Sequence, residues 1–156
     1  MSISSLLATE RVFTTAEISS KKRLLEFIAE KAAVKLELPK SEIYNQLLER
    51  ERLGSTGLGE GFAVPHARLN NLTQTHACFV KLDEAVNYDA NDRQPVDLVF
   101  VILIPEASTE EHLRILASLA KIFSDQSVCD RIRKSESTEQ ILDIIQQAEQ
   151  RQQESS

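Results

Sequence analysis

Apolar residues recur at steps of three and four positions after Ser20, which is the spacing of an α-helix with one buried face. The residues of this stripe are Leu24, Leu25, Ile28, Ala32 and Leu36. A second helix is predicted from Ser41, acting as its N-cap, to Leu53, and Gly54 stands where a left-handed residue often follows a helix. The inward-facing residues of this second helix are Ile43, Leu47 and Leu48.

In the middle of the chain the helical spacing gives way to two short runs that are rich in β-branched residues. The segments from Thr75 to Leu82 and from Val96 to Ile104 are bounded by turn-forming residues, so both are predicted to be strands. The second run is apolar at nearly every position. It therefore indicates a central strand that is covered on both faces.

Helical spacing returns after Pro105. The run Ser108-Thr-Glu-Glu111 matches a capping box and predicts the start of a helix. The apolar face of this helix contains Leu113, Leu116, Ala120 and Phe123. Two further helical stretches are expected at 127–133 and 138–147. Together these elements predict a three-layer α/β fold, in which a small mixed β-sheet is flanked by helices on both faces.

A chain of 156 residues can bury a core without help from disulfides or metals. We expect one domain over residues 1–148, followed by a polar and disordered tail at 149–156. The two cysteines, Cys78 and Cys129, are far apart and form no C-x-x-C motif, so both are expected to be buried thiols rather than a redox or zinc site.

The chain carries 24 acidic and 18 basic residues, which gives a formal net charge of -6. This charge repels a phosphate backbone, so a nucleic acid is not expected as a partner. No stretch approaches the ~20 apolar residues that span a bilayer, and the N-terminus lacks the pattern of a signal peptide. We therefore expect a cytoplasmic protein without membrane insertion.

All four glycines of the chain fall within the eight residues 54–61, which read G-S-T-G-L-G-E-G. Glycines let main-chain N–H groups approach an anion, and the hydroxyls of Ser55 and Thr56 add two donors. The segment is therefore a candidate phosphate-binding loop, with Ser55, Thr56, Gly57 and Gly59 as candidate contacts. A plain connecting loop is the alternative. A dinucleotide fingerprint is excluded because a helix precedes the segment.

His66 stands a few residues after this segment and comes after Pro65, whose φ angle is fixed by its ring. An imidazole that is partly neutral at pH 7 can attack phosphorus without a separate base and can pass the group on. His66 is therefore the candidate nucleophile, although a lone histidine is often only structural. His76 lacks such a context and is interpreted as structural.

Two further residues are candidates for the same site. His112 lies in the first turn of the helix predicted after Pro105, where the helix dipole favours a neutral imidazole that can donate to a phosphate. An exposed polar residue is the alternative. Arg50 or Arg52 could hold phosphate oxygens, but they lie on different sides of the helix, so only one can serve. No spacing of Asp, Glu, His or Cys matches a metal site, and we expect neither a metal nor a cofactor.

The segment from Arg50 to His66, R-E-R-L-G-S-T-G-L-G-E-G-F-A-V-P-H, resembles the active-site segment of the fructose/mannitol-class enzyme IIA domains of the bacterial phosphotransferase system. It is most similar to their nitrogen-regulatory branch. The resemblance covers roughly residues 5–148 and includes Q-P-V-D-L-V-F at 94–100 and E-H-L-R-I-L-A-S-L-A-K at 111–121. Ala67 and Arg68 stand where this family commonly has Gly-Lys.

This resemblance implies a mannitol-type enzyme IIA fold and a phosphohistidine phosphocarrier. His66 would be the phosphoryl acceptor, His112 the second histidine of the active site and Arg50 the basic residue near the phosphate. A small histidine phosphocarrier protein would be the donor. Because no IIB or IIC region is attached, we expect a regulator linked to nitrogen metabolism that acts on protein targets. The alternatives are a separate sugar-specific IIA that passes phosphate to a IIB domain, and an anion-binding module without turnover.

Overall fold

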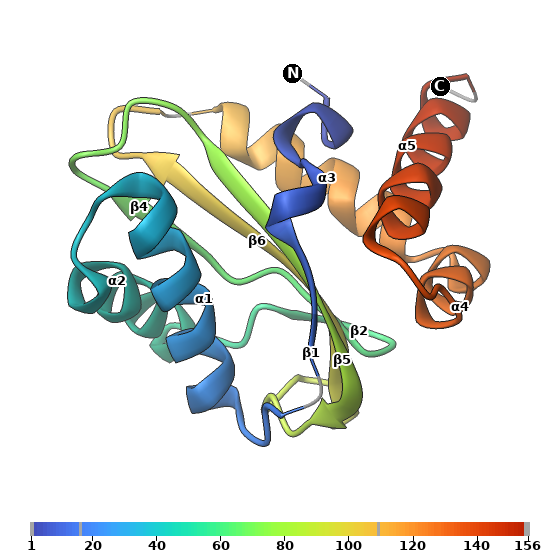
Figure 1. The fold of residues 1–156 in the computed structure, drawn as a ribbon, viewed down its shortest axis with the longest axis horizontal. Helices are drawn as coiled ribbons and strands as arrows, with labels where there is room; N and C mark the ends of the chain where they lie inside the picture. Colours follow the sequence, from blue (N-terminus) through green and yellow to red (C-terminus); the bar gives the residue numbers. More distant parts are fainter. Residues whose placement is uncertain (1, 16, 109, 155–156) are drawn as a thin grey trace.

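The computed structural model describes residues 2–15, 17–108 and 110–154, and in them a mixed six-stranded sheet lies between two layers of helices (Figure 1). The elements, in chain order, are η1 (Ser4–Leu6), η2 (Thr9–Arg11), β1 (Val12–Thr15), α1 (Lys21–Leu36), α2 (Lys40–Arg52), β2 (Gly57–Gly59), β3 (Phe62–Ala63), β4 (His66–Leu69), β5 (His76–Val86), β6 (Val96–Pro105), α3 (Glu111–Phe123), α4 (Gln126–Arg133) and α5 (Thr138–Glu154). The predicted fold class is confirmed.

Strand β6 is the centre of the sheet. It pairs antiparallel with β5 on one side, and on the other side it pairs in parallel with β3 and then with β4. Phe62 is opposite Leu98 and His66 is opposite Ile102, so β3 and β4 keep one register along β6 with a break between them. The residues of β6 from Leu98 to Ile104 are buried, which confirms the predicted central strand.

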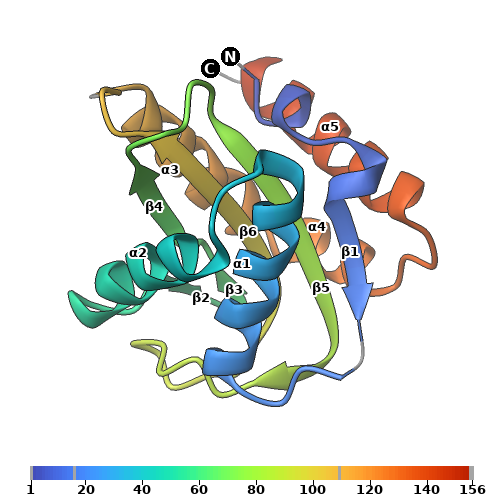
Figure 2. The same ribbon diagram turned by 60° about the vertical axis from the view of Figure 1, so that its left-hand side comes forward.

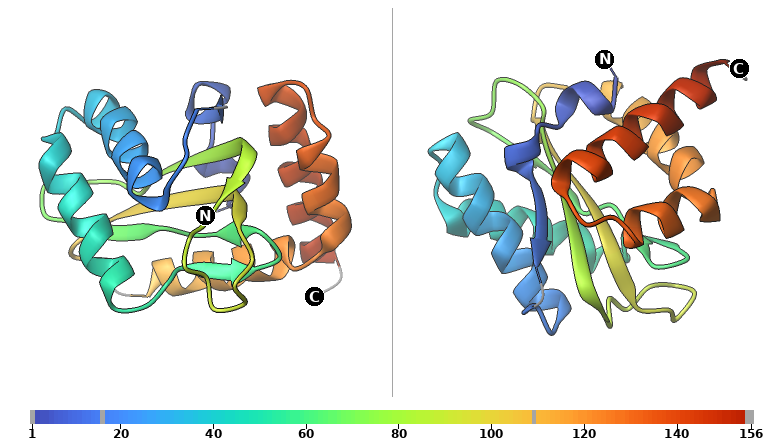
Figure 3. Two further views of the ribbon diagram at one scale, coloured as in Figure 1. Left: turned by 90° about the horizontal axis from the view of Figure 1, so that it is seen from below. Right: turned by 45° about the vertical axis from the view of Figure 1, so that its right-hand side comes forward.

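Each face of the sheet has its own hydrophobic core. Helices α1 and α2 cover one face through residues such as Leu24, Ile28 and Leu47. Helices α3, α4 and α5 cover the opposite face, where the ring of Phe123 stacks on that of Phe62 with their centroids 4.1 Å apart. Figures 2 and 3 show these two helical layers on either side of the sheet. The two cores hold β6 from both sides, which is what makes it a fixed support for β4.

The predicted helix N-caps differ from the observed ones in two places. Ser20 does cap α1, because its side chain accepts a hydrogen bond from the N–H of Arg23. Helix α2, however, begins at Lys40 with Pro39 as its N-cap, so the prediction of Ser41 as the cap was wrong. The predicted capping box at 108–111 was also wrong, because the N-cap of α3 is Glu110 and has no side-chain cap. Residue 109 of that motif lies outside the described residues.

Helix α5 continues through residues 149–154, which the polar composition had led us to expect as a disordered tail. The reason is Glu149, whose buried carboxylate accepts bonds from the N–H groups of Ile3 and Ser4 and from the Ser4 hydroxyl. The start of the chain is thereby attached to its last helix. Residues 155–156 of the expected tail lie outside the described residues.

Both cysteines are free and buried, as predicted. Within the described part of the chain, no helix is both long and apolar enough to cross a membrane.

Candidate active site

A pocket of about 630 Å³ opens beside β4, between the last turns of α2 and the first turns of α3. Its lining residues come from five separate parts of the fold and include Arg50, Ser55, Thr56, His66, Arg68 and His112. The structure thus brings both candidate histidines, Arg50 and the start of the glycine segment to one place. Gly57 and Gly59 do not line this pocket.

The imidazole of His66 is held at both of its nitrogens. Its Nδ1 lies 2.8 Å from the carbonyl oxygen of Val64, which can only accept, so Nδ1 carries the proton. The Nε of Arg50 donates to Nε2 of His66 over 3.2 Å, which requires a lone pair on Nε2. The ring therefore carries its proton on Nδ1 and its lone pair on Nε2, on the side of Arg50.

Burial is the main cause that lowers the pKa of His66 from its ordinary value. The hydrogen bond to Val64 opposes this shift, while the positive charge of Arg50 adds to it. The net result is a histidine that stays neutral at pH 7. A neutral imidazole with a free lone pair is the form that can attack phosphorus.

Arg50 is fixed on the pocket side of α2, where its Nη1 also donates to the carbonyl oxygen of Gly54 over 2.9 Å. Arg52 is instead exposed and paired with Glu49 on the helix surface. Of the two arginines, Arg50 lines the pocket and Arg52 does not.

His112 has a guanidinium partner of its own, Arg68 of β4. The Nη2 of Arg68 lies 3.2 Å from Nε2 of His112. Burial, and then the positive charge of Arg68, lower the pKa of His112. Nδ1 of His112 is buried and has no hydrogen-bond partner among the described residues. Sequence reasoning noted Arg68 only as a departure from Gly-Lys and missed this pair, which joins residues far apart in the chain.

The glycine segment is a β-hairpin rather than an open loop, since it contains β2 and the start of β3. Thr56 lines the pocket but is buried, and both its N–H and its hydroxyl donate to the carboxylate of Glu51. In this structure those donors are therefore not free for a phosphate. Ser55 remains available, because its hydroxyl oxygen accepts from the N–H of Gly57 and its own proton can still be donated.

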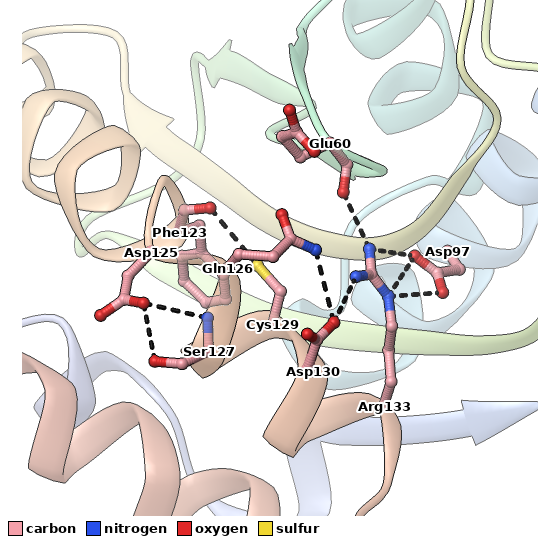
Figure 4. Close-up of polar contacts among 9 residues, drawn as sticks. All are labelled: Glu60, Asp97, Phe123, Asp125, Gln126, Ser127, Cys129, Asp130 and Arg133. Carbon is pink, nitrogen blue, oxygen red and sulfur yellow. Dashed lines mark hydrogen bonds and ion pairs between the residues drawn. The ribbon is translucent and has the colours of Figure 1, made fainter.

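Gly57 and Gly61 have packing roles in this hairpin. A Cβ on Gly57 would lie 2.8 Å from the Cβ of Ala90, so close approach of two chain segments explains the glycine. Gly61 has a φ of +83° and lies against the Arg133 guanidinium. That guanidinium donates to both oxygens of Asp97 and to the carbonyl oxygen of Glu60, and so ties the hairpin tip to α4 and β6 (Figure 4).

The pocket therefore gathers two guanidinium groups, two neutral imidazoles and a hydroxyl in a chain whose net charge is -6. Such a set is complementary to a phosphoryl group, because arginine holds phosphate oxygens in a bidentate manner and the imidazole of His112 can donate. In the described ranges, no three His, Cys, Asp or Glu residues are grouped so that they could hold a metal ion. His76 lies outside the pocket, at the start of β5.

Comparisons with known proteins give consistent results. Residues 5–148 match the family model described as phosphoenolpyruvate-dependent sugar phosphotransferase system, EIIA 2. The chain is 40% identical over 150 residues to the nitrogen regulatory protein of Escherichia coli strain K12, which covers 96% of this chain and 92% of that protein.

Two solved structures are also similar to this one. The nitrogen regulatory protein IIA-Ntr from Neisseria meningitidis superposes with a TM-score of 0.88 at 36% identity, over 92% of this chain and 98% of that one. The mannitol IIA of Escherichia coli superposes with a TM-score of 0.76 at 25% identity, over 89% and 98%. These similarities extend over nearly the whole of each chain.

Proposed function

The chain belongs to the EIIA type 2 family of the phosphoenolpyruvate-dependent sugar phosphotransferase system, and on that premise we propose that it accepts a phosphoryl group on Nε2 of His66. The observation that carries this proposal is the double restraint on the imidazole. Val64 binds the protonated Nδ1, and the lone pair of Nε2 faces the pocket toward Arg50.

The donor is a histidine phosphocarrier protein with its phosphoryl group on an imidazole. The lone pair of Nε2 forms the new N–P bond while the P–N bond of the donor breaks, and that electron pair returns to the donor imidazole. Nδ1 of His66 keeps its proton and its bond to Val64 throughout. No general base is needed, because no proton has to leave His66 in this step.

The two arginines hold the transferred group. Arg50 and Arg68 rest against the imidazole nitrogens at 3.2 Å, and both can turn their N–H groups to phosphoryl oxygens once the group arrives. The ring of His112 has a buried and unpartnered Nδ1. An unsatisfied buried group costs about 1–3 kcal/mol, so rotation of this ring toward a phosphoryl oxygen is favoured. Ser55 supplies a further hydroxyl donor.

The phosphoryl group acts as a signal in nitrogen regulation, in a protein that works in the cytoplasm. The similarity to nitrogen regulatory proteins from two bacteria supports this role over that of a sugar-specific IIA. A dianionic group added at His66 changes the charge of the pocket mouth, where Leu53, Leu58 and Leu113 are exposed apolar residues. A target that binds this face prefers the unphosphorylated form and competes with the phosphocarrier for it.

A phosphotransfer assay tests the proposal. Incubation with a histidine phosphocarrier and its phosphoryl source should label the wild type and the matched control His76→Ala, but not His66→Ala. The label should be lost in acid, because protonation of the nitrogen breaks a P–N bond while a seryl phosphate survives. Full labelling of His66→Ala, or an acid-stable label, would show that the site is wrong. An anion-binding module without turnover would give no label at all.

A second assay separates the two kinds of IIA. The phosphorylated protein is mixed with fructose- and mannitol-type IIB domains, and loss of its label is followed. Rapid transfer to a IIB domain would favour the sugar-specific role. A stable label, together with a target that binds only the unphosphorylated protein, would favour regulation.

A further inference from the structure

Behind the pocket, a buried carboxylate connects α2 to the hairpin. The side chain of Glu51 is only 3% exposed, although it follows directly after Arg50 in the last turn of α2. Its Oε1 accepts from the N–H of Thr56 over 3.1 Å and lies 3.0 Å from the Nζ of Lys21. Its Oε2 accepts from the Thr56 hydroxyl. A buried carboxylate with several polar partners holds the groups that it binds in fixed positions.

The direction of the hydrogen bonds around Thr56 follows from its chemistry. Because the single hydroxyl proton goes to Glu51, the hydroxyl of Tyr88, 2.9 Å away, must be the donor to Thr56. Burial raises the pKa of the Tyr88 phenol well above its ordinary value, so that proton is present at neutral pH. Lys21 also lies over the Tyr88 ring, 4.4 Å from its centroid. Thr56 is thus held at its N–H and at its hydroxyl.

The backbone carries this restraint to the pocket. The carbonyl oxygen of Thr56 accepts from the N–H of Val64 over 3.0 Å. The carbonyl oxygen of Val64 is the acceptor for Nδ1 of His66. Pro65 stands between them, its φ fixed by its ring and its carbonyl oxygen bonded to the N–H of Ile102 in β6. The hydrogen-bonded path therefore runs from Glu51 through Thr56 and Val64 to the imidazole.

We propose that Glu51 is a positioning residue for phosphoryl acceptance: by fixing Thr56 and, through it, Val64, it selects the tautomer of His66 whose lone pair lies on Nε2. Glu51 does not touch the phosphoryl group. This inference rests on the proposed function, since it concerns how the accepting atom is presented. It also explains why a charged side chain is buried beside the pocket, although burying an apolar side chain there would cost less desolvation free energy.

The test begins without any phosphoryl donor. In protein labelled with 15N, the chemical shifts of the two His66 ring nitrogens tell a protonated nitrogen from a bare one. Wild type and Thr56→Ser should show a single form with the proton on Nδ1. Glu51→Gln and Thr56→Val should show a mixture of tautomers. Glu30→Gln removes the same charge from an exposed position on α1 and should leave the spectrum unchanged.

The same variants are then compared in phosphotransfer from the phosphocarrier. Glu51→Gln and Thr56→Val should lower kcat about 10-fold to 100-fold, the range for a misplaced reacting group, with little change in the KM for the donor. Thr56→Ser should restore the wild-type rate. A merely structural role would change the unfolding midpoint without changing the tautomer of the folded protein.

The spectra and the transfer rates together decide whether Glu51 positions the His66 ring. The proposal is overturned if folded Glu51→Gln keeps a single Nδ1-protonated tautomer, or if it transfers phosphate at the wild-type rate. Where Glu51→Gln does not fold, Thr56→Val decides by the same two criteria. If wild type shows the expected tautomer but takes no phosphate, the proposed function fails while the positioning of the ring by Glu51 still stands on the spectra.

Discussion

Arg50 and His66 are joined in the resting protein by a hydrogen bond from the guanidinium Nε to the imidazole Nε2, 3.2 Å long. The bonded nitrogen is the one that the proposed reaction uses. The guanidinium must therefore move off Nε2 as a phosphoryl group arrives, and its N–H groups are then free for the phosphoryl oxygens. In the proposed reaction, the same side chain covers Nε2 before transfer and binds the phosphoryl group after it.

Arg50→Lys should accept phosphate more slowly than wild type, and Arg50→Ala more slowly still. Removing one preorganised donor to developing charge typically costs about 10²-fold to 10³-fold in rate, and we expect Arg50→Ala to fall in that range. Lysine keeps the charge but cannot form two parallel bonds. Quenched-flow measurement of phosphotransfer gives the rates. Equal rates in all three proteins would remove Arg50 from the site.

The stability of the protein should fall as the pH drops from about 6.5 toward 4, in part because of His76. Burial, and then the positive charges of Arg11 and Lys35, lower the pKa of His76 from 6.5 to about 4. Between these values the unfolded chain binds a proton that the folded chain does not, so stability rises with pH in this window. Urea unfolding of His76→Gln should show a shallower pH dependence. An unchanged slope would contradict the low pKa of His76.

Gly61→Ala should lower the free energy of unfolding by about 1–3 kcal/mol, the usual cost of overpacking. A Cβ at this position would lie 2.6 Å from Nη2 of Arg133 and 3.1 Å from Oδ1 of Asp97, on a backbone with φ +83°. Urea unfolding measures the change. Because the hairpin continues into β4, phosphotransfer should slow in the same variant. A protein as stable as wild type would show that the hairpin tip tolerates a side chain.

Glu149→Gln should destabilise the protein by about 1–3 kcal/mol, because the N–H groups of Ile3 and Ser4 lose a buried carboxylate acceptor. The exposed Asp143→Asn on the same helix is the control and should stay within about 0.5 kcal/mol of wild type. Phosphotransfer should be unaffected in both. Equal unfolding midpoints for the two variants would mean that the attachment of the N-terminus contributes nothing.

The helices and long strands could be predicted from the sequence because their signals are local. The spacing of apolar residues in α1 and the apolar run of β6 each lie within one element. The sequences of strands β3 and β4 contain no such local apolar pattern. Each is only two or four residues long, they are separated by Val64 and Pro65, and both form by pairing with β6, more than thirty residues later.

The site was predictable to a similar extent. His66 and Arg50 were identified from one continuous segment, and the structure joins them directly. The partner of His112 could not be identified, because Arg68 reaches it only when β4 lies beside α3. The acceptor of the Thr56 hydroxyl could not be identified for a related reason. Its acceptor, Glu51, lies on the other side of Gly54, and only the turn at the end of α2 brings the two together.

The start of α3 differs from β4 in how firmly it is held. Its N-cap residue, Glu110, makes no side-chain cap, and Leu113 in its first turn is 60% exposed. We expect the amide protons of this turn to exchange with solvent through local fraying, and the amide of Ile102, bonded to Pro65 inside the sheet, to exchange only through global unfolding. One wall of the pocket is therefore expected to open locally while the other stays rigid. In the proposed transfer, an incoming donor imidazole would need to displace only this single helical turn, and the orientation of His66 would be preserved as it enters.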